Sequence, residues 1–258
     1  MLSVVITVKN RNEHFTRTFA SVATQEPGVP FEIVYVDFAS EEDFGECLTK
    51  MIGQYRDLFS DSLAKIKRVV LEGKHPFNSG KAKNLAVPFL DPMSDVISFS
   101  DIDVFLGMDY HRHWASLVKK DVFYSSRVQE TTSQSSRRLS PKINYGNMVV
   151  MRESFVNVGG FDEENPTWGG DDDDIIHRLK LSGLREINPH SFFDARHTSI
   201  VHGDDLRLPF LESHVRTSQN TQEKFKRIYE KTDPLNRSFL RFYNDNIERI
   251  RCEVSYGA

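Results

Sequence analysis

The stretch SVVITVKNRNEHFTRTFASVA, residues 3–23, is typical of a β-strand that leads directly into an amphipathic helix. Val and Ile dominate its first six residues, and β-branched residues favour extended structure. From Phe15 onward, apolar residues recur at a helical spacing. The polar loop KNRNEH, residues 9–14, joins the two elements. The stretch therefore predicts a β–α unit with polar side chains at the carboxyl end of its strand.

The same alternation of apolar strand and helix continues through the first half of the chain. Strands joined by helices form right-handed crossovers, which predicts an α/β fold with a mostly parallel central sheet flanked by helices. Ligands of such sheets bind beyond the carboxyl ends of the strands. The predicted elements are strands FEIVYVDF (31–38), KIKRVVLE (65–72) and DVISFSD (95–101), and helices over 47–58 and 81–89.

The second half of the chain has a less regular pattern. Residues 129–142 are polar and predict a loop, and INYGNMVVMR (143–152) predicts another strand. Residues 172–183 predict a helix closed by Gly183. The remaining apolar patterns predict C-terminal helices, around residues 225–229 and 239–250.

Composition bounds the class of protein. The chain has 258 residues, 39% hydrophobic and 27% charged, which is ordinary for a globular domain with a sizeable core. A net charge of −4 gives no reason to expect a nucleic-acid partner. The two cysteines, Cys47 and Cys252, exclude a disulfide framework or a cysteine metal site. No apolar run is long enough to span a bilayer and no secretory signal is recognisable, so we expect a soluble, cytoplasmic protein or an excised soluble domain.

The stretch FSDIDVF, residues 99–105, places Asp101 and Asp103 directly after an apolar strand. Two carboxylates at a strand end can bind a hard divalent cation, which in turn neutralises a diphosphate. Aspartate is also common in turns that end strands. Either His197 or His202 could complete a metal site with Asp103, although single histidines often have structural roles.

The stretch WGGDDDD, residues 168–174, sets four carboxylates side by side. Helix capping and the helix dipole explain one or two of them, and Asp174 can pair with Arg178 one turn later. A calcium-binding EF-hand is excluded because its glycine and late glutamate are missing. We interpret one carboxylate as a general base, since crowding raises its pKa. Its neighbours would bind sugar hydroxyls or cap the helix, and Trp168 would face a sugar ring.

The loop after the first strand carries basic and amide side chains. Lys9 and Arg11 can contact a diphosphate or a ribose, and Asn10 can contact a base or the backbone. A helix N-terminus with solvated charges is the competing interpretation.

The order of these motifs resembles the catalytic domain of β-1,4-galactosyltransferases and the chondroitin-polymerase-type domains of bacterial family 2 glycosyltransferases. The resemblance runs from about residue 3 to about residue 202 and rests on VKNRNEHF, VDFAS, HPFNSGKAKN, FSDID, NYGNMVVMRESFVNVGGFDE, WGGDDDDIIHRL and RHT. It implies a GT-A (Rossmann-like) fold in a single domain over 1–258. The implied parts are a nucleotide-binding half (1–105), an acceptor-side half (106–211) and C-terminal helices (212–258).

The resemblance also implies roles for individual residues. Asp172 would be the catalytic base and would contact the acceptor together with Trp168 and Asp171, which stands where the family usually has glutamate. The metal, Mn²⁺ or Mg²⁺, would be bound by Asp103 and by His197, which the RHT context selects. The donor-binding positions would be Lys9, Arg11, Asp37, Phe77, Lys81, Asp101, Tyr145, Trp168 and Gly170.

The resemblance implies an inverting, metal-dependent glycosyltransferase. It would move galactose, N-acetylgalactosamine or a related hexose from a UDP-sugar to a hydroxyl of a carbohydrate acceptor. A nucleotidyltransferase is an alternative, but VKNRNEH lacks the glycine-rich phosphate loop that such an enzyme normally has. A non-catalytic module that binds a nucleotide sugar or a glycan is a second alternative.

Overall fold

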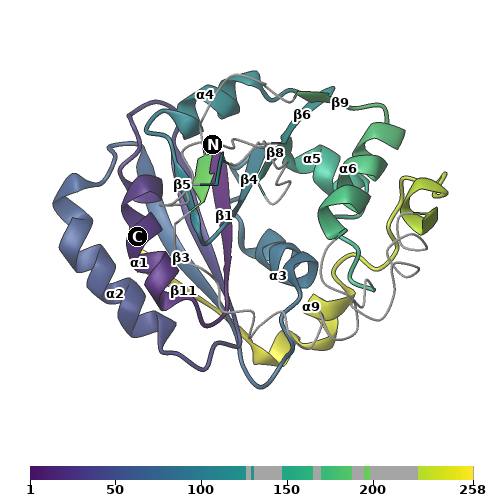
Figure 1. Ribbon diagram of the computed structural model, residues 1–258. Helices are drawn as coiled ribbons and strands as arrows, with labels where there is room; N and C mark the ends of the chain where they lie inside the picture. Colours follow the sequence, from purple (N-terminus) through teal and green to yellow (C-terminus); the bar gives the residue numbers. More distant parts are fainter. Residues whose placement is uncertain (126–128, 131–146, 165–169, 188–194, 198–225, 258) are drawn as a thin grey trace.

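The computed structural model describes residues 1–125, 129–130, 147–164, 170–187, 195–197 and 226–257. In this part of the chain an eight-stranded sheet lies between helices (Figure 1). Its strands are β1 (Leu2–Val8), β2 (Phe31–Phe38), β3 (Leu63–Leu71), β4 (Val96–Asp101), β6 (Val122–Ser125), β8 (Met148–Met151), β9 (Arg185–Ile187) and β11 (Ile250–Tyr256). The helices are α1 (Asn12–Ala23), α2 (Phe44–Tyr55), α3 (Ser79–Ala86), α4 (Tyr110–Leu117), α5 (Arg152–Asn157), α6 (Asp171–Leu181) and α9 (Arg241–Asp245), with short 3₁₀ turns η1 (Arg56–Leu58), η2 (Val87–Phe89) and η4 (Ile247–Arg249).

The strand order of the sheet is β11-β3-β2-β1-β4-β8-β6-β9. β3, β2, β1 and β4 are mutually parallel, and β6 is parallel to β9. β8 runs antiparallel to β4 and β6, and β11 runs antiparallel to β3. The predicted mostly parallel sheet with flanking helices is therefore confirmed.

The central strands of the sheet are buried on both faces, as their near-continuous apolar sequences require. All residues of β1 and β2 are buried. Side chains alternate along β1, so Val4 and Ile6 pack toward one helical layer and Val5 toward the other. The first layer contains α1, α2 and α4, and the second contains α3, α5 and α6 (Figure 1). Burial of one large apolar side chain contributes about 1.5–3 kcal/mol, so these two layers supply most of the stability.

The end of the chain differs from the prediction. A helix was expected around residues 239–250, but α9 ends at Asp245, η4 follows, and Ile250–Tyr256 form the strand β11. Ile250, Cys252, Val254 and Tyr256 alternate with polar residues, a period that suits a strand. Pairing with β3 satisfies backbone groups that would otherwise lie at the edge of the sheet.

A smaller sheet, in the order β5-β10-β7, contains β5 (Val104–Leu106), β7 (Gln129–Glu130) and β10 (Ala195–His197). Residues 129–142 were predicted as a loop, but the first two of them, Gln129 and Glu130, form the strand β7. The rest of that segment lies outside the described residues. Among the described helices, none combines the length and the apolar character needed to cross a membrane.

Candidate active site

The carboxyl ends of three parallel strands bring predicted site residues to one edge of the sheet. The register pairs Val8 at the end of β1 with Asp37 on β2, and Thr7 with Asp101 on β4. Asp103 follows in the turn between β4 and β5 and is buried. Tertiary structure therefore places the acidic pair where ligands of parallel sheets bind.

A buried lysine joins this edge to the acidic helix start. Lys83 of α3 is only 1% exposed, and its Nζ lies 3.7 Å from Asp101 Oδ1 and 3.6 Å from Asp172 Oδ1. The ammonium also lies 5.1 Å from the ring centroid of Phe161. One cation thus connects the two acidic motifs of the chain, and the sequence analysis did not identify it. The available signal was a lysine within the apolar side of α3, next to Ala82.

Electrostatics make Asp172 suitable as a base. The pKa of Asp172 is raised to about 7, mainly by burial; Lys83 opposes this rise, and the carboxylates of Asp171, Asp101 and Asp173 add to it. Burial alone would lower the pKa of Lys83, but Asp172 and Asp101 outweigh it and raise that pKa above its usual value. Lys83 therefore keeps its positive charge at neutral pH. Asp172 keeps 27% of its side-chain surface exposed, so an incoming group can reach it.

The four consecutive aspartates divide into different environments. Asp174 is buried and accepts hydrogen bonds of 2.8 and 2.7 Å from Nε and Nη2 of Arg178, so the predicted pair is confirmed. Arg178 also donates to the carbonyl oxygens of Val158 and Gly160. The other three lie in the partly exposed first turn of α6, where the helix dipole favours carboxylates.

Gly170 precedes α6 with φ = 80°, a left-handed conformation that favours glycine. The backbone conformation alone explains why a glycine precedes the four aspartates, and contact of Gly170 with the donor stays a prediction.

The loop after β1 is tied to the end of β2. Lys9 Nζ donates to the carbonyl oxygens of Phe38 and Ala39, at 3.2 and 2.7 Å, and burial lowers the pKa of Lys9. Asp37 Oδ2 accepts from Arg68 Nη2 at 2.6 Å. Arg11 occupies the position before α1 and is partly exposed. Lys9 and Asp37 thus hold the edge together, and their contacts with a nucleotide stay predictions.

Phe77 and Lys81, predicted for the donor pocket, lie beside the carboxyl end of β2. The ring of Phe77 packs edge-on against Phe38, with centroids 5.9 Å apart. Lys81 Nζ lies 5.2 Å from the ring centroid of Phe242 on α9. The C-terminal segment therefore reaches this part of the predicted site.

Several predicted positions lie outside the described residues, namely Tyr145, Trp168 and the alternative metal ligand His202. For His197 the backbone alone is described, and the register places it opposite Val104, the residue after Asp103. Among the side chains that the structure describes, no three His, Cys, Asp or Glu residues are grouped to hold a metal. The two carboxylates of Asp101 and Asp103 are hard oxygen donors of the kind that Mn²⁺ and Mg²⁺ accept.

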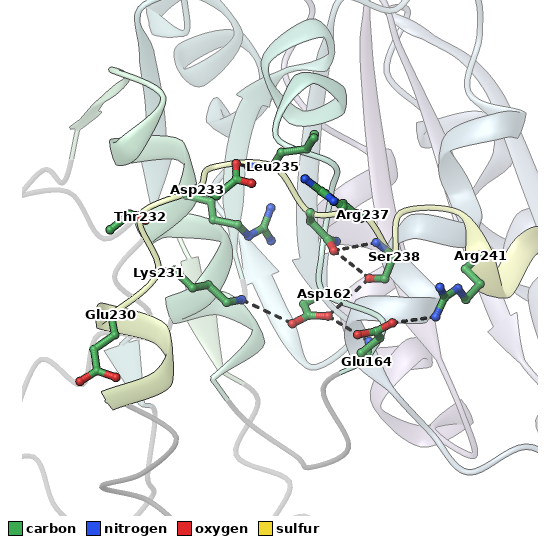
Figure 2. A pocket seen from close by; sticks show the side chains of 12 residues that line it. Asp162, Glu164, Glu230, Lys231, Thr232, Asp233, Leu235, Arg237, Ser238 and Arg241 are labelled. Carbon is green, nitrogen blue, oxygen red and sulfur yellow. Dashed lines mark hydrogen bonds and ion pairs between the residues drawn. The ribbon is translucent and has the colours of Figure 1, made fainter.

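A cavity of about 430 Å³ lies away from these residues, between the segment after α5 and residues 230–241 (Figure 2). Two ion pairs lie among its lining residues, Lys231 with Asp162 at 3.5 Å and Arg241 with Glu164 at 2.7 Å, and Lys231 also pairs with Asp174. None of the predicted site residues lines it.

Comparison with known proteins places this geometry in context. A sequence family described as the N-terminal domain of galactosyltransferase matches residues 129–202. β-1,4-Galactosyltransferase 2 of Mus musculus is 27% identical over 168 residues, which are 60% of this chain. The match spans 41% of that relative's length, so the chain spans well under half of the relative.

Solved structures share the fold at low sequence identity. S. aureus TarS 1-349 superposes with a TM-score of 0.58 at 16% identity, covering 95% of this chain and 73% of that one. A mannosyltransferase from Pyrobaculum calidifontis, solved with GDP-Man and Mn²⁺, gives 0.58 at 16% identity, covering 95% and 75%. The catalytic domain of Drosophila β1,4-galactosyltransferase 7, solved with xylobiose, gives 0.52 at 14% identity, covering 90% and 82%. The GT-A fold and the resemblance to galactosyltransferases are thus confirmed.

Proposed function

We propose that the protein transfers a hexose, galactose or N-acetylgalactosamine or a relative of these, from a UDP-sugar to a hydroxyl of a glycan, with inversion and with a divalent metal. The observation that carries the proposal is the position of Lys83, which brings Asp101 at the predicted donor edge and Asp172 at the predicted acceptor side to one point. A binding module has no need of a half-buried carboxylate with a pKa near 7, whereas a general base does.

The reaction is a single displacement. The acceptor oxygen bonds to the anomeric carbon as the bond from that carbon to the UDP oxygen breaks, and UDP leaves with the electron pair. Asp172 accepts the proton of the acceptor hydroxyl, and the negative charge of Asp172 is stabilised by Lys83. Asp171, together with Trp168, would contact the acceptor sugar. No covalent sugar–enzyme intermediate is required, because one carboxylate acts as base and none as nucleophile.

Asp103 would hold the metal, with Asp101 supporting the metal or the donor ribose and His197 as a further ligand. When bound, the metal would supply Lewis-acid stabilisation of the departing diphosphate. Support for Mn²⁺ comes from the oxygen donors at the end of β4 and from the Mn²⁺ in the solved mannosyltransferase of the same fold. The relative named as a galactosyltransferase supports galactose as the first donor sugar to test.

Thermal unfolding with UDP, with Mn²⁺ and with both tests the donor site without knowledge of the acceptor. A ligand at about 100 times its Kd adds about 2.7 kcal/mol of stability. We expect a shift that requires both ligands and that Asp103→Ala abolishes, while the exposed Asp61→Asn variant retains it. No shift with UDP, with or without metal, would overturn the UDP-sugar donor.

Turnover is tested separately by release of UDP from UDP-galactose in the presence of candidate saccharides. Asp172→Asn should bind UDP with Mn²⁺ as the wild type does but lose turnover, because the amide cannot accept the proton. A wild-type protein that binds UDP but releases none from any UDP-hexose would indicate the binding module instead.

A further inference from the structure

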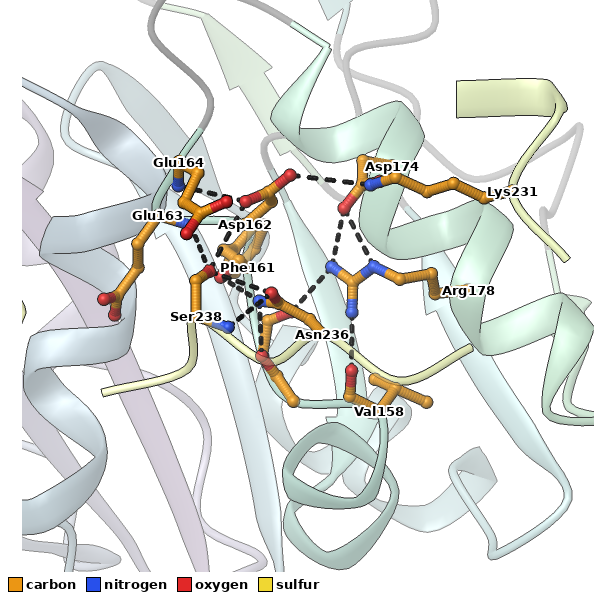
Figure 3. A network of polar contacts seen from close by, with 12 residues as sticks. Val158, Phe161, Asp162, Glu163, Glu164, Asp174, Arg178, Lys231, Asn236 and Ser238 are labelled. Carbon is orange, nitrogen blue, oxygen red and sulfur yellow. Dashed lines mark hydrogen bonds and ion pairs between the residues drawn. The ribbon is translucent and has the colours of Figure 1, made fainter. Parts of the chain in front are cut away.

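The glycine pair after α5 docks the C-terminal part of the chain. Gly159 and Gly160 have φ values of 79° and 57°. A Cβ on Gly159 would lie 2.2 Å from the carbonyl oxygen of Asn236, and one on Gly160 would lie 2.5 Å from the ring of Phe239. Asn236 Nδ2 in turn donates to the carbonyl oxygens of Gly159 and Phe161, both at 2.8 Å (Figure 3). Gly159 therefore permits a close approach of two backbones, and Gly160 leaves room for the Phe239 ring.

A buried carboxylate then fixes where α9 begins. Glu163 is 5% exposed, and its Oε1 accepts from Asn84 Nδ2 of α3 at 2.9 Å. The same carboxylate accepts from the backbone N–H groups of Leu240, at 3.1 Å, and Phe242, at 2.7 Å. Burial raises the pKa of Glu163, and these donors oppose the rise. Three elements distant in the sequence are thus held by one side chain, which sets the direction of Phe242.

The ring of Phe242 meets the residues around the predicted donor pocket. It stacks on Phe38, at the end of β2, with centroids 5.5 Å apart and planes at 26°. It meets His75, in the loop after β3, edge-on at 5.7 Å. Lys81 Nζ lies over its face at 5.2 Å, within the range of a cation–π contact. Phe38 also contacts Phe77, so the aromatic cluster is continuous.

We propose that Phe242 is a positioning residue of the donor site, whose ring holds the Lys81 ammonium where an anionic nucleoside diphosphate binds. A lysine side chain loses considerable rotamer freedom when it binds an anion, and a ring face that already restrains it lowers that cost. The negative face of the ring attracts the cation without neutralising it, so the charge stays available for phosphate. The inference rests on the proposed function, because it assumes that Lys81 contacts the donor.

Isothermal titration of the 258-residue chain with UDP in the presence of Mn²⁺ tests this role. Phe242→Leu should raise the Kd about three- to tenfold, and Phe242→Tyr, which keeps the ring, should change it less than about twofold. Phe239→Leu is the matched control: it lies in the same segment but contacts Phe155, at 6.1 Å, rather than Lys81. Its Kd should stay within about twofold of the wild type.

A double-mutant cycle separates positioning from folding. In a Lys81→Met background, Phe242→Leu should add no further loss of UDP affinity, because the charge it positions is gone. The proposal is overturned if Phe242→Leu binds like the wild type, if Phe239→Leu weakens binding equally, or if the losses at residues 81 and 242 are additive. If the wild type itself does not bind UDP, the proposed function fails and the positioning role fails with it. Thermal unfolding of each variant shows whether it is folded before the titration.

Discussion

Lys83 Nζ lies 3.6 Å from Asp172 Oδ1, with the lysine buried and the aspartate partly accessible. This separation is longer than a normal hydrogen bond, so the attraction is mainly between charges. An arrangement of this kind lowers the energy of the ionised carboxylate without covering its outer surface. It is therefore suited to a base that must both carry a charge and meet a substrate.

Removal of this cation should alter the pH dependence of turnover. Lys83→Met leaves the effects of burial and of Asp171, Asp101 and Asp173 unopposed, so the pKa of Asp172 should rise above about 7. The base must be ionised, and we expect kcat/KM at neutral pH to fall about tenfold, with its acidic limb moved to higher pH. Measurement of kcat/KM against pH for UDP release checks this.

Two further variants sharpen that experiment. Lys83→Arg keeps the charge and should keep the acidic limb near its wild-type position. Lys120→Met removes an exposed lysine from a surface ion pair and should leave the profile unchanged. An acidic limb in Lys83→Met at the wild-type pH would contradict the assigned role of the lysine.

The buried pair Asp174–Arg178 should be far more important for stability than an exposed pair of the same spacing. Arg178→Met removes two hydrogen bonds from the buried carboxylate, which keeps only Lys231 as a charged partner, and it removes the donor to the carbonyl oxygens of Val158 and Gly160, so it should cost about 3–5 kcal/mol. Arg17→Met breaks the exposed pair Arg17–Glu13 and should cost less than about 1 kcal/mol. Urea unfolding of both variants provides the comparison, and similar losses would show that burial is not the deciding factor.

His111 should make the protein sensitive to acid. Burial lowers the pKa of His111 from 6.5 to about 3. The unfolded chain therefore binds the proton more readily, so this contribution to stability is complete above pH 6.5 and is lost as the pH falls toward 3. His111→Phe, at a site that packs on Phe31, should reduce the loss of unfolding free energy between about pH 7 and about pH 5 by about 2 kcal/mol.

Urea unfolding at both pH values measures this change. The partly exposed His113 offers a control, since His113→Gln should retain most of the wild-type pH dependence. An unchanged slope in His111→Phe would assign the acid sensitivity to other groups.

Two glycine-to-alanine changes should have opposite effects on the free energy of unfolding. Gly159→Ala places a Cβ against the Asn236 backbone at positive φ and should destabilise the protein by at least about 2 kcal/mol. Gly53 lies within α2 with no atom near the added Cβ, so Gly53→Ala should stabilise by about 0.5–1 kcal/mol. Thermal unfolding distinguishes the two, and a neutral Gly159→Ala would argue against the docking of the C-terminal segment.

Local sequence determined most of the sheet and its direction. Two local patterns predicted the strands over 31–38, 65–72 and 95–101 and the helices between them. A strand that is buried on both faces is a continuous apolar run, and a helix that is buried on one side has apolar residues at a helical spacing. The same logic predicted that Asp37, Asp101 and Asp103 would lie at the carboxyl edge. It also predicted the Asp174–Arg178 pair, since residues four apart on a helix are neighbours by geometry alone.

Tertiary structure decided what those residues meet. The sequence could not show that Lys83 lies between Asp101 and Asp172, because its two partners come from a strand and a helix that touch only after folding. Nor could it show that Glu163 holds α9, or that the last strand pairs with β3. Periodicity shows which face of a helix or strand is buried. The residues that pack against that face depend on long-range contacts, which form only when the chain folds. These contacts bring the two acidic motifs together into one site.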